Sequence, residues 1–521
     1  MMNYTDYRQR HYSMRIFTVF LFLMLAVSGI GFSIYLFYIS NNIYMYFIAV
    51  IFLLLSLISG FFNFSASMLY YRSFFYNAYF KKIAKHAYKL NNNLPTVAIA
   101  IPIFNEDIKI VKRTVSNIVK IKYDTKKLKF YMLDDSTKPE KRKELKKLAE
   151  DYGFTYLYRK DRRGFKAGAL NNFIKYSKEE YIAIFDYDEK LINKNFLLDL
   201  LPYFEDKNLS YLQTEKAYFR TGKLFPDSVA LFDSFFFNFI EPARALDNTA
   251  IFAGSCGLIR RSALDSVGGF PEYVIEDTFF SFESDTHKFR SLYVPKVYAL
   301  GEPIKTFTAL AKQQWRYNYG DTQFLGYFFK RNKAIKSPVS NVDYLTHGFG
   351  LNYISLMLIL FTIISIFIVF SAVPFESINF YRVLLEGGTV SVYVYLELFG
   401  IFALLLSFMG PVIMTKVYFG SIKKGAMVYL LNFALAIVRT KAAIAALLHR
   451  NPGISWNRNR DVVINKLAYS ILNTKFELSF TALIFVFSLI AYLTKHVGGG
   501  VWLMAYGFLY LTTTIFIYKY K

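Results

Sequence analysis

Long apolar stretches at both ends of the chain enclose one broad polar region, and this pattern predicts the domain organisation. Apolar runs of about 20 residues, long enough to cross a bilayer as a helix, recur along the chain. They cover residues 16–39, 44–62, 349–372, 395–418, 478–493 and 501–518. We therefore predict two transmembrane helices within 1–71, a polar domain over 72–345, and a C-terminal membrane region of about four helices over 346–521.

Inside the polar domain, short apolar strands alternate with helical segments. The run TVAIAIPIF (96–104) is apolar at nearly every position, as expected for a strand buried on both faces. Further strands are predicted at 129–135, 155–159 and 181–188, and helices at 106–121, 138–152 and 165–178. This alternation predicts an α/β domain with a doubly wound, Rossmann-like sheet, in which ligands bind beyond the carboxyl ends of the strands.

Acidic side chains follow two of these strands. Asp134 and Asp135 end one, and Asp186 and Asp188 end a neighbouring one. They could be solvated turn acids, but clustered carboxylates repel one another unless cations bind, and Mg²⁺ or Mn²⁺ prefers oxygen ligands. We therefore predict a metal–diphosphate site, with Asp186 and Asp188 on one strand face because alternate positions point the same way. Glu189 falls off that face and is predicted to be a solvated neighbour.

A basic segment with two glycines, KDRRGFKAGALNNF (160–173), precedes a predicted helix. A helix that begins near 167–168 would present free backbone N–H groups to a phosphate, with Lys166 beside them. The alternative, a solvated basic loop, explains residues 160–163 better than it explains Lys166.

Composition and charge favour a membrane protein over a nucleic-acid-binding one. The formal net charge is +24, yet 54% of the residues are hydrophobic and 19% are aromatic. Lys and Arg gather beside the apolar runs, as they do on the cytoplasmic side of membrane proteins, and no zinc spacing or RNA-binding motif is present. We therefore expect a multi-pass protein of the cell membrane, with both termini and the polar domain in the cytosol. The single cysteine, Cys256, excludes an intramolecular disulfide framework and fits a reducing compartment.

The segment 425–448 is also long enough to span a membrane, but it contains Arg439 and Lys441. Basic residues flank it on both sides, so a spanning helix would leave one basic flank outside. We therefore favour an amphipathic helix at the cytosolic interface, followed by a basic loop that contains Pro and Gly at 449–466.

Nine short motifs, in this order, resemble the membrane-embedded family 2 glycosyltransferases, which include the cellulose, hyaluronan and chitin synthases. They are AIPIFNED (100–107), LDDS (133–136), KAGALN (166–171), DYD (186–188), QTEKAYF (213–219), GSCGLIRRSAL (254–264), IED (275–277), GEP (301–303) and QQWRY (313–317). The resemblance implies a cytosolic GT-A glycosyltransferase domain inserted between transmembrane helices, with amphipathic interface helices. The loop 449–466 loosely resembles the gating segment of cellulose synthases.

The resemblance also implies roles for the acidic and basic motifs. Asp134 and Asp135 would hold the uridine part of a nucleotide-sugar, and Lys166 would meet its phosphates. Asp186 and Asp188 would bind Mg²⁺ or Mn²⁺ on the diphosphate. Asp277 matches the general base of the family, with Glu276 beside it as a structural acid or a partner in catalysis.

The last motif, QQWRY, and the GSCG segment carry the remaining implied contacts. Gln313 and Arg316 match the family pattern Gln-x-x-Arg-Trp and would bind the donor, whereas Tyr317 replaces the family tryptophan and Trp315 lies two positions earlier. The implied acceptor-binding residues are Gly254, Ser255, Cys256, Trp315 and Tyr317.

Together these features imply an inverting, metal-dependent enzyme that extends a β-linked polysaccharide from a nucleotide-sugar, with a UDP-hexose as the leading donor. It would translocate the polymer through its own helices, in contact with membrane lipids and without nucleic acid. One alternative is a non-processive transferase that places one sugar on a lipid-linked acceptor. Another is a transporter or scaffold without chemistry, which predicts no ordered set of acids and bases. The sugar, the linkage and the oligomeric state are not encoded in these motifs.

Overall fold

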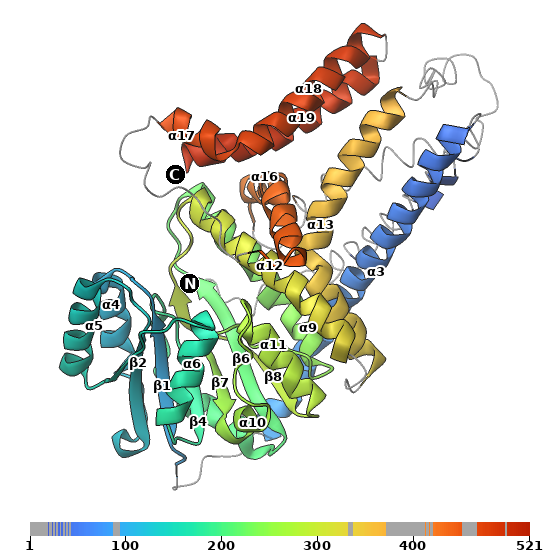
Figure 1. Cartoon of the computed structure of the whole chain (residues 1–521). Coiled ribbons are helices and arrows are strands. Elements are labelled where there is room, and N and C mark those ends of the chain that lie inside the picture. The colour runs from blue at the N-terminus through green and yellow to red at the C-terminus, as the bar shows by residue number, and fades with distance from the viewer. Residues whose placement is uncertain are drawn as a thin grey trace.

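The computed structural model describes residues 43–86, 94–331, 337–370, 420–450, 466–494 and 497–520, together with isolated positions within 19–40 and 412–416. An α/β domain forms one end of the molecule, and long helices extend from it to the other end (Figure 1). Most of the predicted segments 16–39 and 395–418 falls outside the described residues, as does most of the loop 449–466.

The α/β domain contains an eight-stranded mixed sheet in the order β3-β2-β1-β4-β7-β6-β8-β5. The strands are β1 Val97–Ile103, β2 Leu128–Asp134, β3 Thr155–Tyr158, β4 Tyr181–Ile184, β5 Lys190–Leu191, β6 Leu209–Tyr218, β7 Gly257–Arg260 and β8 Arg290–Gly301. Strands β3, β2, β1 and β4 are parallel, whereas β7 runs antiparallel to both β4 and β6. The GT-A-like α/β class is confirmed, but the sheet is mixed beyond β4 rather than parallel throughout.

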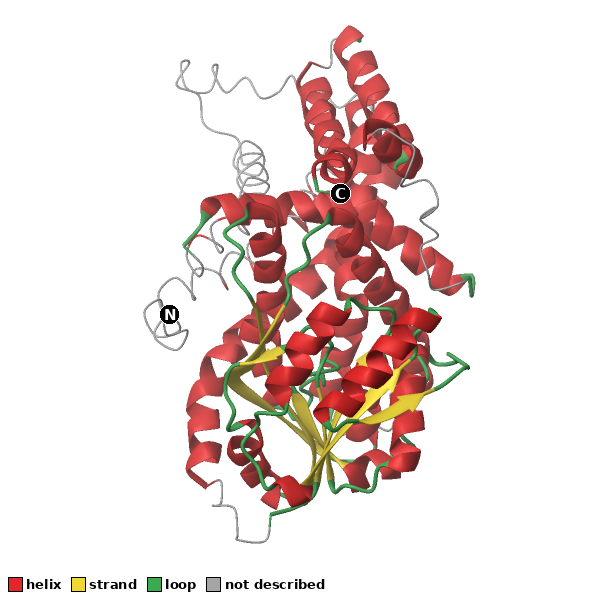
Figure 2. Ribbon diagram, turned by 90° about the vertical axis from the view of Figure 1, so that its left-hand side faces the viewer, coloured by secondary structure: helices red, strands yellow, loops and turns green. Residues whose placement is uncertain are grey.

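Helices cover both faces of this sheet (Figure 2). In this domain they are α4 Ile108–Ile118, η1 Thr125–Lys127, α5 Pro139–Tyr152, α6 Phe165–Tyr176, α7 Phe196–Leu200, η2 Leu201–Glu205, α8 Leu224–Phe235, η3 Phe236–Ile240, α9 Glu241–Ala245, α10 Arg261–Ser266 and α11 Glu276–Thr286. The sequence of β1 explains the layering, because its side chains alternate between faces. Its Val and Ile residues pack in one core with α4 and α5, whereas Ala98 and Ala100 let α6 approach the other face closely.

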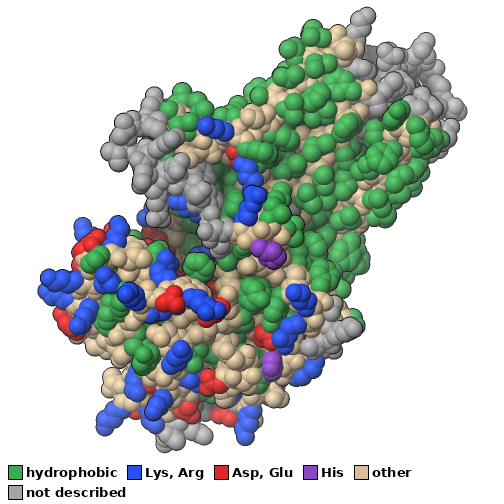
Figure 3. Space-filling model, viewed as in Figure 1, with side chains coloured by type: hydrophobic (Ala, Val, Ile, Leu, Met, Phe, Trp, Pro, Cys, Tyr) green, Lys and Arg blue, Asp and Glu red, His purple; other side chains and the backbone are tan. Residues whose placement is uncertain are grey.

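The remaining helices are α3 Ile43–His86, α12 Phe307–Arg331, α13 Pro338–Phe370, α16 Ile422–Leu447, α17 Lys466–Asn473, α18 Lys475–Leu493 and α19 Val497–Lys519. Among the described residues, 4 helices are long and apolar enough to cross a membrane, or up to 5 if the bent pair within α13 is one span. Hydrophobic side chains cover this end of the molecule, whereas Lys, Arg, Asp and Glu gather on the α/β domain (Figure 3). The predicted insertion of an α/β domain between apolar helices is therefore confirmed.

Helix α16 is among the candidate spans, although its two charges led us to expect an interface helix. The Arg439 side chain is fully buried and donates to Gln314 Oε1 of α12 at 3.0 and 2.7 Å. Lys441 forms an ion pair of 2.7 Å with Glu477 of α18. Because Arg439 is hydrogen-bonded and Lys441 is ion-paired inside the protein, the two residues no longer argue against a span; the placement at the interface stays a prediction.

Helix α12 connects the α/β domain to the membrane helices and lies between them (Figure 1). Gly320 permits the closest approach, because a Cβ there would lie 2.6 Å from the side chain of Ile275. Ile275 directly precedes Glu276 and Asp277. The sequence of α12 thus fixes one face of this helix against the predicted catalytic acids.

Candidate active site

Asp186 lies at the centre of a cluster of charged side chains beyond the carboxyl end of β4. Its Oδ1 accepts a hydrogen bond of 2.9 Å from Lys166 Nζ, and its Oδ2 accepts one of 2.8 Å from Ser255 Oγ. Lys216 Nζ lies 3.4 Å from the same Oδ2. Burial alone would raise the pKa of Asp186, but the two lysines outweigh it and hold the pKa below its ordinary value, so this carboxylate stays ionised.

The prediction for Glu189 was wrong. Its side chain is buried, with 3% of the residue exposed, and it accepts from Ser255 Oγ at 2.6 Å and from the backbone N–H of Asp186 at 2.8 Å. It also lies 3.4 Å from Lys216 Nζ. Glu189 therefore supports the loop that carries Asp186.

The strand argument for Asp186 and Asp188 also fails, because β4 ends at Ile184 and both acids lie in the turn that follows. Asp188 is held through its backbone carbonyl, which accepts a hydrogen bond of 3.1 Å from Arg113 of α4. Burial, and then the charges of Asp186 and Glu189, raises the pKa of Asp188 to about 7. Lys216 acts against this rise but does not offset it, and Asp188 has no ion pair with Lys166 of the kind that Asp186 has.

Lys166, Gly254 and Asp277 converge from three separate elements. Lys166 lies in the first turn of α6, which begins two residues earlier than the predicted 167–168, and donates to the Gly254 carbonyl at 3.0 Å. Gly254 has a φ of +78°, and a Cβ there would lie 3.0 Å from Asp277 Oδ2 and 3.3 Å from Lys166 Nζ. The Asp277 carboxylate and the Lys166 ammonium thus face each other across a glycine that leaves no room for a side chain.

Glu276 and Asp277 lie together in the first turn of α11. Asp277 Oδ1 accepts a hydrogen bond of 2.8 Å from the backbone N–H of Thr278. Burial raises the pKa of Asp277, although Lys166 and Arg316 act against this rise. Burial and the adjacent Asp277 raise the pKa of Glu276 to about 7. Burial therefore makes both carboxyl groups better proton acceptors than exposed ones.

The first acid pair is already engaged by neighbouring residues. Asp134 is buried and accepts from the backbone N–H of Ser136 at 2.7 Å and from Tyr156 Oη at 2.5 Å. Asp135 accepts two hydrogen bonds of 2.6 Å from Arg159, which the sequence analysis did not single out. Their implied contacts with a nucleoside stay a prediction, and Arg159 joins them as a residue at the same sheet edge.

The QQWRY motif lies on α12, but its members face different neighbours. Tyr317 packs with the core around Ile275, next to the acid pair, whereas Trp315 packs near Val274 and α16. Arg316 is exposed, and its charge acts on Glu276 and Asp277. Gln313 Oε1 and Trp315 Nε1 are buried and have no hydrogen-bond partner within the part of the chain that the structure describes. The structure thus separates the two aromatics that we expected to share one acceptor.

The GSCG segment contributes its backbone and one hydroxyl group. Ser255 is fully buried, and its Oγ bridges Asp186 and Glu189 while accepting from Lys216 at 2.6 Å. Cys256 lies in the core, with 1% exposed, so its side chain is not open to an acceptor. Lys216 lies within the motif QTEKAYF, but the motif itself did not assign it a role. Its proximity to Asp186 arises from folding of β6 beside β7.

The charges of this cluster do not balance. The five carboxylates of the cluster are Asp186, Asp188, Glu189, Glu276 and Asp277, and its three cations are Lys166, Lys216 and Arg316. When all of them are ionised, two negative charges are left uncompensated. Within the described residues, no group of three His, Cys, Asp or Glu side chains is arranged to hold a metal ion. A Mg²⁺ or Mn²⁺ ion would therefore need oxygen atoms from a bound substrate as well as Asp186 and Asp188, which is common for Mg²⁺ on phosphates.

Comparison with known proteins matches residues 98–268 to the family described as Glycosyl transferase family 2. The chain thus contains a glycosyltransferase domain of family 2, and its relatives include catalytic subunits of cellulose synthase. It is 30% identical over 240 residues to the UDP-forming cellulose synthase catalytic subunit of Pseudomonas fluorescens (strain SBW25), covering 44% of this chain and 31% of that protein. It is 29% identical over 239 residues to the probable glucomannan 4-beta-mannosyltransferase 7 of Oryza sativa subsp. japonica, covering 43% and 40%.

The alignments therefore span less than half the length of these relatives. Among solved structures, the mannosyltransferase PcManGT from Pyrobaculum calidifontis, in complex with GDP-Man and Mn2+, is 18% identical with a TM-score of 0.46. That alignment covers 74% of this chain and 99% of the solved one.

Proposed function

We propose that this protein is an inverting, metal-dependent glycosyltransferase that uses a nucleotide-sugar, with a UDP-hexose favoured, to extend a β-linked polysaccharide. The catalytic domain and both termini face the cytosol, and the polymer leaves through the protein's own transmembrane helices. The observation that carries this proposal is the convergence of Asp277, Lys166 and Asp186 around Gly254. The cellulose synthase and mannosyltransferase relatives support it.

The geometry suits a single displacement at the anomeric carbon. Asp277 takes the proton from an acceptor hydroxyl group as its oxygen attacks the anomeric carbon, and the bond from that carbon to the donor phosphate breaks. The electron pair of the broken bond leaves with the nucleoside diphosphate. Lys166 lies at the N-terminus of α6, where an ammonium group and free backbone N–H groups bind phosphate oxygens. One displacement inverts the anomeric centre.

The uncompensated acids identify where a metal ion would be held. Asp186 and Asp188 would bind Mg²⁺ or Mn²⁺, which supplies positive charge to the departing diphosphate. The raised pKa of Asp188 supports this role, because a carboxyl group left without a cation takes up a proton instead.

Replacement of Asp188 by Ala should weaken metal-dependent nucleotide binding about tenfold or more, because one oxygen ligand is lost. Titration of purified protein with the nucleoside diphosphate, with and without Mn²⁺, measures this effect. Asp151→Ala, a change at an exposed helix end, is the control. If Mn²⁺ increases nucleotide affinity as much in Asp188→Ala as in the wild type, Asp188 is not a ligand of the metal ion.

Transfer should slow as the pH falls. A base accepts a proton only when ionised, and the pKa of Asp277 is raised, so its inactive protonated form accumulates at a higher pH than for an ordinary aspartate. Activity therefore rises with pH through this raised pKa. Asp277 raises the pKa of Glu276, but Glu276 is not among the groups that raise the pKa of Asp277, so Glu276→Gln should leave the acidic limb of the pH–rate profile in place. A limb that moves to lower pH would show that Glu276 is ionised while Asp277 titrates.

The proposed function is tested with the full chain in nanodiscs, supplied with radiolabelled UDP-glucose, UDP-N-acetylglucosamine or GDP-mannose and with Mn²⁺ or Mg²⁺. We expect one donor to yield a polymer that glycosidases specific for β-linkages digest. A single sugar on a lipid would instead identify a non-processive transferase. No transfer from any donor would contradict the proposal.

A further inference from the structure

A buried carboxyl group on α12 lies beside the proposed base and has no partner. Asp321 is 7% exposed, yet it forms no hydrogen bond or ion pair within the part of the chain that the structure describes. Burying such a group without a partner costs free energy, so a buried carboxyl group is usually hydrogen-bonded. Asp321 is therefore a candidate for contact with a ligand.

The position of Asp321 on α12 directs it toward the proposed acceptor path. It follows Tyr317 by one helical turn, so both residues lie on the same face of the helix. It also follows Gly320, which packs against Ile275 directly before the acid pair. Burial, and then the charge of Asp277, raises the pKa of Asp321 well above its ordinary value, whereas Arg439 lowers it.

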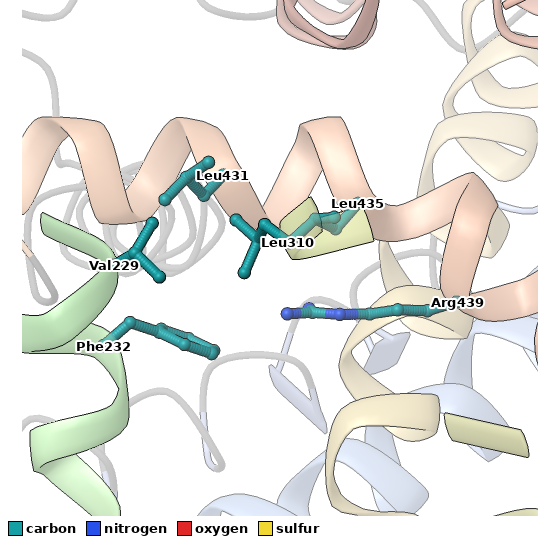
Figure 4. Close-up of a pocket in the computed structure, with 6 residues that line it drawn as sticks. All are labelled: Val229, Phe232, Leu310, Leu431, Leu435 and Arg439. Atoms are coloured by element: carbon teal, nitrogen blue, oxygen red, sulfur yellow. The ribbon is translucent and has the colours of Figure 1, made fainter. Parts of the chain in front are cut away.

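Polar groups continue along the same face of α12 toward α16. Gln314 lies two turns before Asp321, and its Oε1 accepts from Arg439. The Arg439 guanidinium points across a cavity toward Phe232 (Figure 4), with its Cζ 5.7 Å from the ring centroid. This cavity is otherwise lined by Val229, Leu310, Leu431 and Leu435 and is too small to admit a water molecule. Asp321, Gln314 and Arg439 thus form a polar row that leads from the catalytic acids to the membrane helices.

We propose that Asp321 is a sugar-binding residue whose carboxyl group hydrogen-bonds a hydroxyl group of the acceptor saccharide, beyond the sugar that Asp277 activates. This inference rests on the proposed function and adds a saccharide subsite to it. A protonated carboxyl group donates one hydrogen bond and accepts others, and a sugar hydroxyl group does both as well. The subsite therefore favours a neutral, hydroxyl-rich saccharide.

The test compares Asp321→Asn with Asp321→Leu in the full chain in nanodiscs, with the donor that the wild type turns over. The measured quantity is the ratio of sugar incorporated into polymer to nucleotide released, since release without incorporation reports transfer to water. Asp321→Asn keeps a donor and an acceptor, so its ratio should stay within about twofold of the wild type. Asp321→Leu loses both, so its ratio should fall about tenfold and its chains should shorten. Lys330→Leu, an exposed change on the same helix, is the control.

Two results would overturn the subsite while leaving the proposed function in place. An unchanged ratio in Asp321→Leu, with lower total turnover and a lower Tm, would make Asp321 a structural residue. An equal loss in both variants would show that its charge, rather than its hydrogen bonding, is required. If the wild type transfers no sugar at all, the proposed function is overturned, and the subsite with it.

Discussion

Replacement of Asp277 by Asn should abolish sugar transfer while leaving nucleotide binding largely intact. An amide of the same shape cannot take the proton from the acceptor hydroxyl group, and general base catalysis typically contributes about 10²–10⁴-fold to the rate. The rest of the cluster should persist, because the hydrogen bond from the Thr278 backbone N–H can be made to the amide oxygen. Lys166 also keeps its bonds to Asp186 and Gly254.

Two measurements on the purified variant check this expectation: the rate of polymer formation, and the Kd of the nucleoside diphosphate by calorimetry. Asp265→Asn is the control, because Asp265 is exposed and pairs only with Arg261 of its own helix turn. We expect full activity from it. A large loss of nucleotide affinity in Asp277→Asn would instead assign Asp277 to donor binding.

Replacement of Gly254 by Ala should also be severe, with turnover reduced about 10²-fold. The new Cβ would lie 3.0 Å from Asp277 Oδ2 and 3.3 Å from Lys166 Nζ, so the carboxylate and the ammonium group would both have to shift. Displacements of this order at a catalytic centre can cost about 10²-fold in rate. The positive φ adds strain of about 1–2 kcal/mol to any residue other than glycine.

Gly153→Ala separates the strain of a positive φ from the displacement of the catalytic side chains. Gly153 has a φ of +72° as the C-cap of α5, but a Cβ there meets nothing within 4 Å. Both variants should therefore lose similar stability in thermal unfolding, whereas only Gly254→Ala should lose turnover. Comparable turnover in the two variants would mean that the space at Gly254 is not needed for catalysis.

The sequence predicts the strands and the sheet edge well, because their signals are local. The nearly continuous apolar run of β1 and the acids that follow the apolar residues of β2 and β4 were visible in short segments of chain. The environment of Glu189 was not visible in this way, because its partner Lys216 comes from β6 and its partner Ser255 comes from the loop before β7. A spacing argument cannot supply contacts that form only when antiparallel β7 inserts between β4 and β6.

The candidate site on α12 shows the same limit. The resemblance implied acceptor binding by both Trp315 and Tyr317, but successive residues on a helix are turned by about 100°, so residues two apart point in very different directions. Asp321 went unnoticed because a single acid four residues beyond a motif carries no signal in one sequence. Its significance follows from its burial and from the contact of Gly320 with Ile275.

The contact between Gly320 and Ile275 has a mechanical consequence. Gly320 of α12 packs directly against Ile275, and Gln314 of the same helix is held by Arg439 of α16. We therefore expect a shift of α16 to move the segment that carries the catalytic acids. Changes in bilayer thickness or lateral pressure that displace α16 should then alter the rate of sugar transfer. An α/β domain cut free of its membrane helices would lose the part that aligns its acids.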